Sequence, residues 1–246
     1  MNEEKKNLNQ SLNNTKISYL NWSDFVKNFL QKSSITMIWG NVGIGKTTLA
    51  LQLSREILKN NLKVFYLYTK FGPLDQLIKR ILSVKKDLSD SGFILWHSQS
   101  FYRQKDIILN WLLQIQQLST YFKEKKVGLL IIDEIVSLYL LELGKEAKNE
   151  KLNQDLVLLL ATLKKIQVEY QIPILILNTF SIKQNEKKES EVVPHGGKII
   201  DYWTSFEIKI DRTAQVSRMK FSIIKNKDFF EIPQKWTWNL SENGFK

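Results

Sequence analysis

Residues 40–48 read Gly40-Asn41-Val42-Gly43-Ile44-Gly45-Lys46-Thr47-Thr48. This run fits G-x-x-x-x-G-K-T, the pattern of a phosphate-binding loop. An apolar run at residues 35–39 precedes it and predicts a buried strand. Leu49, Leu53 and Ile57 follow it with helical spacing. The motif therefore lies between a strand and the first turn of a helix, which is the setting in which it binds a nucleotide.

The residue types of this stretch suit the phosphates of ATP. Glycines let the backbone turn tightly and bring bare N–H groups close to phosphate oxygens. The helix N-terminus adds unpaired N–H groups and about half a positive charge. We expect Lys46 to reach the β- and γ-phosphates and the Thr47 hydroxyl to bind Mg²⁺. The predicted nucleotide-binding residues are Gly40, Asn41, Val42, Gly43, Ile44, Gly45, Lys46, Thr47 and Thr48.

A second motif lies at residues 127–134, where an apolar run ends in Asp133 and Glu134. An apolar strand that ends in an acid is the Walker B pattern of phosphate-loop ATPases. An aspartate at the tip of a buried strand is costly unless it has a partner. A Mg²⁺ ion beside the phosphate loop is the natural partner, so we predict Asp133 as its second protein contact.

The bulk composition sets wide bounds. The chain has 246 residues, a net charge of +11 and no cysteine. It therefore forms no disulfide and has no thiol chemistry, which suits the cytoplasm. No apolar run reaches about 18 residues, so no membrane span is expected. A basic protein tends to bind polyanions, although a lysine-rich solvated surface gives the same charge.

The order of the predicted elements indicates an α/β fold. Residues 1–16 are polar and are expected to form a flexible tail, with a single ATP-binding domain over 17–246. Strands alternate with helices up to residue 178, and residues 180–195 are expected to be an irregular loop. Later segments alternate apolar and polar residues, as antiparallel strands do. These segments are 199–210, 219–225 and 236–240. We predict a mostly parallel central sheet, flanked by helices, with C-terminal antiparallel strands.

The same order of motifs resembles the RecA-like recombinase ATPase core. Residues 194–203, Pro-His-Gly-Gly-Lys-Ile-Ile-Asp-Tyr-Trp, resemble the segment after the second DNA-binding loop of archaeal and eukaryotic recombinases. Residues 236–245 resemble their last strand and tail. The resemblance covers about residues 30–246 and is greatest to short archaeal recombinase paralogues of the RadB kind.

The resemblance implies ATP-dependent binding of single-stranded DNA, or assistance to the main recombinase in repair. It places one DNA loop at 141–152 and a second at 180–195. A basic groove with an aromatic side chain suits single strands, and the residues implied for the second loop are Phe180, Lys183, Lys187 and Lys188. However, residues 134–206 hold nine basic and ten acidic side chains. A solvated loop without DNA is therefore an open alternative.

Other departures from the family pattern point away from a fully active, filament-forming recombinase, and we expect ATP hydrolysis to be slow or absent. The family has a catalytic glutamate after the second strand, whereas this chain reads Tyr68-Thr69-Lys70. A protonated lysine cannot act as that base, but it could neutralise γ-phosphate charge. The glutamine that senses the γ-phosphate in the family is replaced by Thr179. The Phe-x-x-Ala peg used for filament assembly is not evident near the N-terminus.

Two questions stay open at the level of sequence. Glu134 could be a substitute catalytic base or a salt-bridge partner, with Lys70 as the nearest candidate. The whole protein could be an accessory recombinase paralogue, with or without oligomerisation on ATP. Alternatively, it could be a KaiC-like nucleotide-gated scaffold or signalling ATPase that acts through protein partners. A third reading is an interaction partner without nucleotide turnover.

Overall fold

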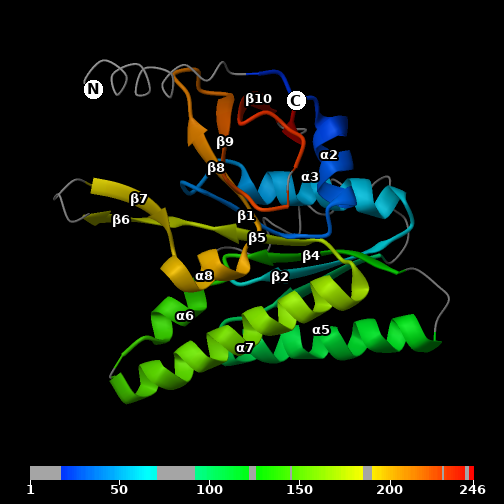
Figure 1. Ribbon diagram of the computed structural model, residues 1–246, viewed down its shortest axis with the longest axis vertical. Coiled ribbons are helices and arrows are strands. Elements are labelled where there is room, and N and C mark those ends of the chain that lie inside the picture. The colour runs from blue at the N-terminus through cyan, green and yellow to red at the C-terminus, as the bar shows by residue number, and fades with distance from the viewer. Residues whose placement is uncertain are drawn as a thin grey trace, which may run out of the picture.

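A nine-stranded sheet forms the centre of the computed structural model, in the order β11-β10-β9-β8-β1-β5-β4-β2-β3 (Figure 1). The model describes residues 18–70, 92–121, 126–144, 146–184, 190–228, 230–241 and 244–246. The expected tail at 1–16 lies outside these residues. The strands are β1 Ile35–Gly40, β2 Lys63–Tyr68, β3 Phe93–His97, β4 Val127–Asp133, β5 Ile174–Asn178, β8 Phe206–Arg212, β9 Arg218–Asn226, β10 Lys235–Ser241 and β11 Gly244–Phe245.

In the order of the sheet, the strands β8, β1, β5, β4, β2 and β3 run parallel to one another. The C-terminal strands β9, β10 and β11 pair antiparallel. The pairs β2–β3, β2–β4, β4–β5, β1–β5 and β1–β8 are all parallel. The pairs β8–β9, β9–β10 and β10–β11 are antiparallel. Parallel neighbours need long crossovers, and helices supply them here. The predicted fold class, a mostly parallel helix-flanked sheet with an antiparallel C-terminal edge, is confirmed.

Helices cover both faces of the sheet (Figure 1). One face carries α2 and α3, and the other carries α5 and α7. Two short helices, α6 and α8, follow β4 and precede β8. The helix bounds are α2 Trp22–Gln31, α3 Lys46–Lys59, α5 Phe101–Tyr121, α6 Ser137–Glu142, α7 Glu146–Tyr170 and α8 Gly197–Trp203. None of these helices combines the length and apolar character of a membrane span.

The parallel strands β1, β2, β4 and β5 contribute buried residues to both cores because their side chains alternate between the two faces. In β4, Leu129 and Ile131 join the core under α2 and α3. Leu130 and Ile132 join the core under α5 and α7. All four side chains are fully buried. A strand buried on both faces reads as a continuous apolar run, which is why the sequence identified it.

Three predicted segments differ in the structure. Residues 199–203 belong to α8, and β8 then pairs parallel to β1 as well as antiparallel to β9. A short alternation cannot distinguish one turn of helix from a strand. The first predicted DNA loop, 141–152, lies largely at the start of α7, so it is helical. The second, 180–195, was expected to be irregular but contains an antiparallel hairpin of β6 Phe180–Gln184 and β7 Ser190–Pro194, seen extending away from the sheet in Figure 1.

The C-terminal strands pack beneath the helix that follows the phosphate loop. The Gln52 side chain donates to the Phe245 carbonyl at 3.0 Å and accepts from the Phe245 N–H at 2.8 Å. The Phe245 ring packs edge-on against Phe221, with centroids 5.3 Å apart. These contacts hold α3 against the C-terminal strands, which come much later in the chain.

Candidate nucleotide-binding site

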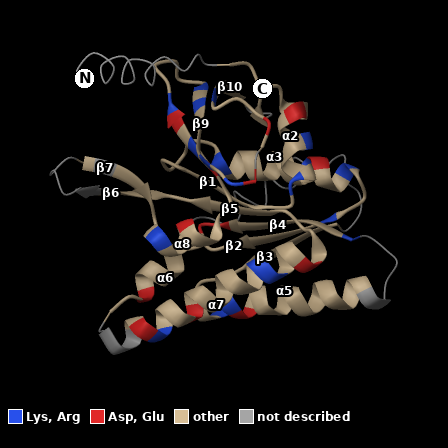
Figure 2. Cartoon of the chain, viewed as in Figure 1, with Lys and Arg blue, Asp and Glu red and all other residues tan. Residues whose placement is uncertain are grey.

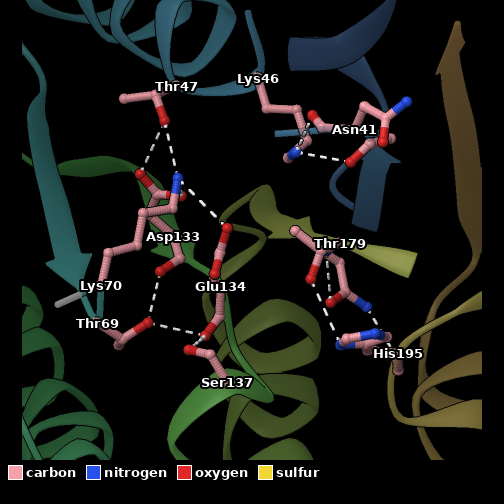
Figure 3. Close-up of polar contacts among 12 residues, drawn as sticks. Asn41, Lys46, Thr47, Thr69, Lys70, Asp133, Glu134, Ser137, Thr179 and His195 are labelled. Atoms are coloured by element: carbon pink, nitrogen blue, oxygen red, sulfur yellow. Dashed lines mark hydrogen bonds and ion pairs between the residues drawn. The ribbon is translucent and has the colours of Figure 1, made fainter. Parts of the chain in front are cut away.

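The predicted site residues lie at the carboxyl ends of neighbouring parallel strands. The phosphate loop follows β1, Lys70 follows β2, and Asp133 ends β4. Tyr68 pairs with Asp133 across β2 and β4, so Lys70 emerges next to the Walker B aspartate. Carboxyl ends of parallel strands are where ligands bind in open α/β sheets. Figure 3 shows that the side chains of Thr47, Lys70, Asp133 and Glu134 converge.

The phosphate loop has the backbone that its glycines permit. Gly45 caps α3 with a φ of 98°, a left-handed conformation that favours glycine. A Cβ at Gly45 would lie 2.7 Å from the Phe245 ring, so close packing also requires glycine there. The Gly45 carbonyl accepts from the Leu49 N–H at 2.9 Å, which begins the helix. The loop and helix N-terminus are therefore placed as the motif predicts.

Lys46 folds back over the loop, and its side chain is only 4% exposed. Its Nζ donates to the carbonyls of Gly40 and Asn41, both at 2.8 Å (Figure 3). Burial, followed by the positive charge of Lys70, lowers the pKa of Lys46 to about 8, against the raising effect of Glu134 and Asp133. A phosphate would supply the negative charge that this ammonium needs.

Asp133 is fully buried and is held by hydroxyl groups from two other elements. Its Oδ2 accepts from Thr47 Oγ1 at 3.0 Å and from Tyr66 Oη at 2.9 Å. The sequence motifs predict Thr47 at this position but not Tyr66. The available signal was that a tyrosine in a buried strand needs a hydrogen-bond partner for its hydroxyl.

Lys70 completes this cluster with a positive charge. Its Nζ lies 2.8 Å from Asp133 Oδ1 and 3.5 Å from Glu134 Oε1. It also donates to Thr47 Oγ1 at 3.2 Å. Burial alone would lower the pKa of Lys70, but the charges of Asp133 and Glu134 and the hydrogen bond to Asp133 outweigh it and raise that pKa. Lys70 therefore stays protonated at neutral pH, and its ion pair with Glu134 is present.

The backbone at Glu134 is unusual and is held by the hydroxyl of the residue that follows β2. Glu134 has a φ of 72°, in the left-handed region that few non-glycine residues adopt. The Thr69 hydroxyl lies 2.5 Å from the Asp133 carbonyl and 2.7 Å from the Glu134 carbonyl. Ser137 Oγ donates to the Glu134 carbonyl at 3.0 Å. These contacts turn the Glu134 side chain toward Lys70 (Figure 3).

The donor atoms at this position suit Mg²⁺. Hydroxyl and carboxylate oxygens are the ligands that Mg²⁺ prefers, and one or two protein oxygens plus phosphates are its usual set. Thr47 and Asp133 would hold the ion, which when bound neutralises charge on the β- and γ-phosphates. Among the described residues, no three His, Cys, Asp or Glu side chains are grouped as metal ligands. Phosphate oxygens would therefore complete the coordination.

A second polar cluster lies where β5 leads into the β6–β7 hairpin. Asn178 Nδ2 donates to the His195 carbonyl at 2.8 Å, and the His195 N–H donates to the Thr179 carbonyl at 3.0 Å. The Thr179 hydroxyl lies 3.4 Å from His195 Nδ1 (Figure 3). Thr179 occupies the position at which RecA-like recombinases have a glutamine. Here it closes the base of the hairpin.

The predicted DNA-contacting residues have different positions on this hairpin. Phe180 is partly buried, and its ring lies edge-on to Trp39 at 6.4 Å between centroids. Lys183 pairs in register with Glu191 across β6 and β7. Lys187 and Lys188 lie outside the described residues.

The helices α5 and α7 carry charged residues of both signs, as Figure 2 shows. Their described parts therefore show no continuous basic stripe in this view.

Trp39 connects the phosphate loop to a buried carboxylate. Its Nε1–H donates to Glu207 Oε1 at 2.6 Å, and the Lys209 ammonium lies 5.4 Å from its ring. Glu207 is 3% exposed. Burial, the largest effect, raises the pKa of Glu207, although the hydrogen bond from Trp39 lowers it. No local sequence pattern indicates this pair, because its residues are far apart in the chain.

Glu207→Gln is expected to stabilise the protein at neutral and alkaline pH. A folded-state pKa above the unfolded value gives stability at low pH that is lost as pH rises through the folded pKa. Glutamine has no charge to bury and keeps an oxygen that accepts from Trp39. We expect a gain on the order of 1 kcal/mol, or about 2–4 °C in Tm, at pH 8. Thermal unfolding at pH 4.5 and pH 8 measures it, and an equal gain at both values would contradict the explanation.

Comparison with known proteins places this site in a family. A family model described as an AAA domain matches residues 5–180. The chain is 30% identical over 191 residues to the DNA repair and recombination protein RadB of Methanococcus maripaludis, covering 77% of this chain and 82% of the relative. RadB of Methanosphaera stadtmanae is 29% identical over 211 residues, covering 82% and 86%. RadB of Methanocaldococcus jannaschii is 30% identical over 183 residues, covering 74% and 80%.

These matches agree with the nucleotide-binding motif and with the RecA-like sheet. They support the recombinase-paralogue interpretation, and none of them supports the scaffold alternative. The chain belongs to the RadB family of DNA repair and recombination proteins, which are RecA-like recombinase paralogues with an AAA-type ATPase domain.

Proposed function

We propose that this protein binds ATP with Mg²⁺ at the phosphate loop and acts as an accessory in DNA recombination and repair. In that role it binds single-stranded DNA or assists the main recombinase, possessing slow or no ATP hydrolysis. The observation that carries the proposal is the cluster of Thr47, Asp133 and Lys70 beside the loop, in a chain with RadB relatives.

The ATP-binding part of the proposal rests on complementary charge. Lys46 is buried and lies among carbonyl groups, with a lowered pKa, so a phosphate ligand would stabilise its charged form. Unpaired N–H groups at the start of α3 add donors for the phosphates. This arrangement supports the proposed roles of Gly40 to Thr48 in binding the nucleotide and of Thr47 and Asp133 in holding Mg²⁺.

The DNA-binding part rests on the hairpin and on the RadB relatives. The β6–β7 hairpin leaves the sheet next to β5, and Thr179 and His195 close its base beside the site. A nucleotide that shifts this base would shift the hairpin with it. Phe180, Lys183, Lys187 and Lys188 remain the proposed DNA contacts, with Phe180 needing to leave Trp39 before it stacks on a base.

Fluorescence anisotropy with labelled single-stranded DNA tests the proposal, with and without Mg·ATP and at two salt concentrations. Phosphate contacts release counterions, so DNA affinity should fall steeply with salt. We expect salt-sensitive binding that changes with ATP, and a loss of that change in Lys46→Ala. Absence of DNA binding at low salt, together with no association with the main recombinase, would refute the accessory role.

Slow hydrolysis is proposed because Lys70 occupies the position at which RecA-like recombinases have their catalytic glutamate. Glu134 is the remaining carboxylate near the γ-phosphate position, but Lys70 already pairs with it. Glu134→Gln should lower ATP turnover by roughly tenfold, less than the usual contribution of a general base. Single-turnover hydrolysis measures this effect, and ADP affinity serves as the control because it should not change. Unchanged turnover would leave Glu134 as a salt-bridge partner only.

A further inference from the structure

The Lys70 ammonium lies among the same oxygen atoms that would surround a divalent cation. Its Nζ is 2.8 Å from Asp133 Oδ1, 3.2 Å from Thr47 Oγ1 and 3.5 Å from Glu134 Oε1. The first two residues are the ones expected to hold Mg²⁺ in this motif. An ammonium with three N–H donors can satisfy three oxygen atoms at once.

In this arrangement each oxygen atom of Asp133 contacts at least one polar side chain. Oδ2 accepts from Thr47 and from Tyr66, and Oδ1 pairs with Lys70. Asp133 is fully buried, so its charge needs a cation close by. Lys70 supplies that cation from within the chain, with a side chain that is 25% exposed.

A metal ion added to this cluster would meet two positive charges. Lys46 lies buried over the phosphate loop, and Lys70 Nζ lies 2.8 Å from Asp133 Oδ1. Mg²⁺ also demands near-ideal octahedral geometry and loses its water reluctantly. Entry of the ion would therefore require Lys70 to give up Asp133, against the attraction of Asp133 and Glu134.

We infer that Lys70 is a built-in substitute for the divalent cation, so that this protein binds nucleoside di- and triphosphates without a metal ion. This inference rests on the proposed function only for nucleotide binding at the phosphate loop. It adds to that proposal that Mg²⁺, although it accompanies ATP, is not required for the nucleotide to bind. Lys46 and Lys70 together then neutralise the phosphates from two sides.

The test compares the dissociation constant of a fluorescent ADP analogue in MgCl₂ and in EDTA. For the wild-type protein the two values should agree within about threefold. Lys70→Met keeps the length of the stem and removes the charge, so its affinity should fall about tenfold in EDTA and recover with MgCl₂. Lys70→Arg keeps a positive charge and should remain insensitive to EDTA.

Mn²⁺ provides a second measurement, because its electron paramagnetic resonance signal changes when the ion binds protein. With ADP present, wild type should leave the Mn·ADP signal unperturbed, whereas Lys70→Met should perturb it. Lys59→Met is the matched control, because Lys59 lies on α3 and pairs with Glu56 at the surface. Thermal unfolding of each variant confirms that it is folded.

The outcomes separate the two proposals. A wild-type affinity that falls tenfold or more in EDTA, with the same ratio in Lys70→Met, would overturn the substitution while leaving nucleotide binding intact. Failure to bind the nucleotide in either buffer would overturn both the nucleotide-binding part of the proposed function and this inference. DNA binding is measured independently and does not affect either result.

Discussion

Lys46→Ala is expected to lower the affinity for ATP and ADP by about 100-fold, because it removes a charge-assisted contact to the phosphates. The Lys46 ammonium is buried above the loop and is held only by the carbonyls of Gly40 and Asn41 among the described residues. Those neutral oxygens do not compensate the charge as a phosphate does. Isothermal titration calorimetry with each nucleotide measures the loss.

The alanine variant should remain folded. The substitution removes a buried ammonium whose pKa burial already lowers to about 8, so its absence does not leave an unpaired charge. Lys59→Ala is the matched control on the same helix, because Lys59 is half exposed and contacts Glu56. Affinities that agree within about threefold between wild type and Lys46→Ala would contradict the predicted role of the loop.

Asp133→Asn is expected to destabilise the protein by about 3 kcal/mol, because breaking a buried ion pair leaves the other charge uncompensated. Asparagine keeps the shape of the side chain but leaves the Lys70 ammonium with only the more distant Glu134 carboxylate, 3.5 Å away, among its described ion-pair partners. One of the two carboxylate oxygens is also replaced by an NH₂ group, which donates hydrogen bonds. If that group takes the place of Oδ2, it cannot accept from Thr47 or from Tyr66. The partial exposure of Lys70 keeps the loss at the lower end of the range for buried pairs.

Urea unfolding of the single variants and of the Lys70→Met/Asp133→Asn double variant measures this loss. The double variant removes both charges, so it should recover part of the stability. The single Asp133→Asn variant should unfold about 6–12 °C below wild type in a thermal scan. If the double variant loses the sum of the two single losses, the residues do not interact and the ion pair contributes nothing.

The phosphate loop and the Walker B strand could be predicted from sequence because each is specified within about ten residues. Gly45 and Lys46 lie in one local pattern with fixed spacing. Asp133 follows an apolar run whose length and composition fit only a buried strand in this setting. The local sequence around each motif is therefore enough to predict its structure.

Other parts of the site depend on contacts between distant residues, and local patterns do not encode these. Tyr66 reaches Asp133 across two strands, and Trp39 reaches Glu207 across β1 and β8. The helical turn of α8 could not be separated from a strand because it is seven residues long. Lys70 was noticed as a departure from a family pattern, but its position among three oxygen atoms required the structure.

The contact between Gln52 and Phe245 has a consequence for the order of folding. The two residues are separated by 193 positions in the chain, so this support forms only after nearly the whole described chain has been synthesised. Contacts of such separation form late, because long loops must close first. A nascent chain that ends before β10 would carry the complete phosphate-loop motif without the ring that packs against Gly45. Competence to bind nucleotide is therefore expected to arise near the end of folding, which would keep partly folded chains from binding ATP.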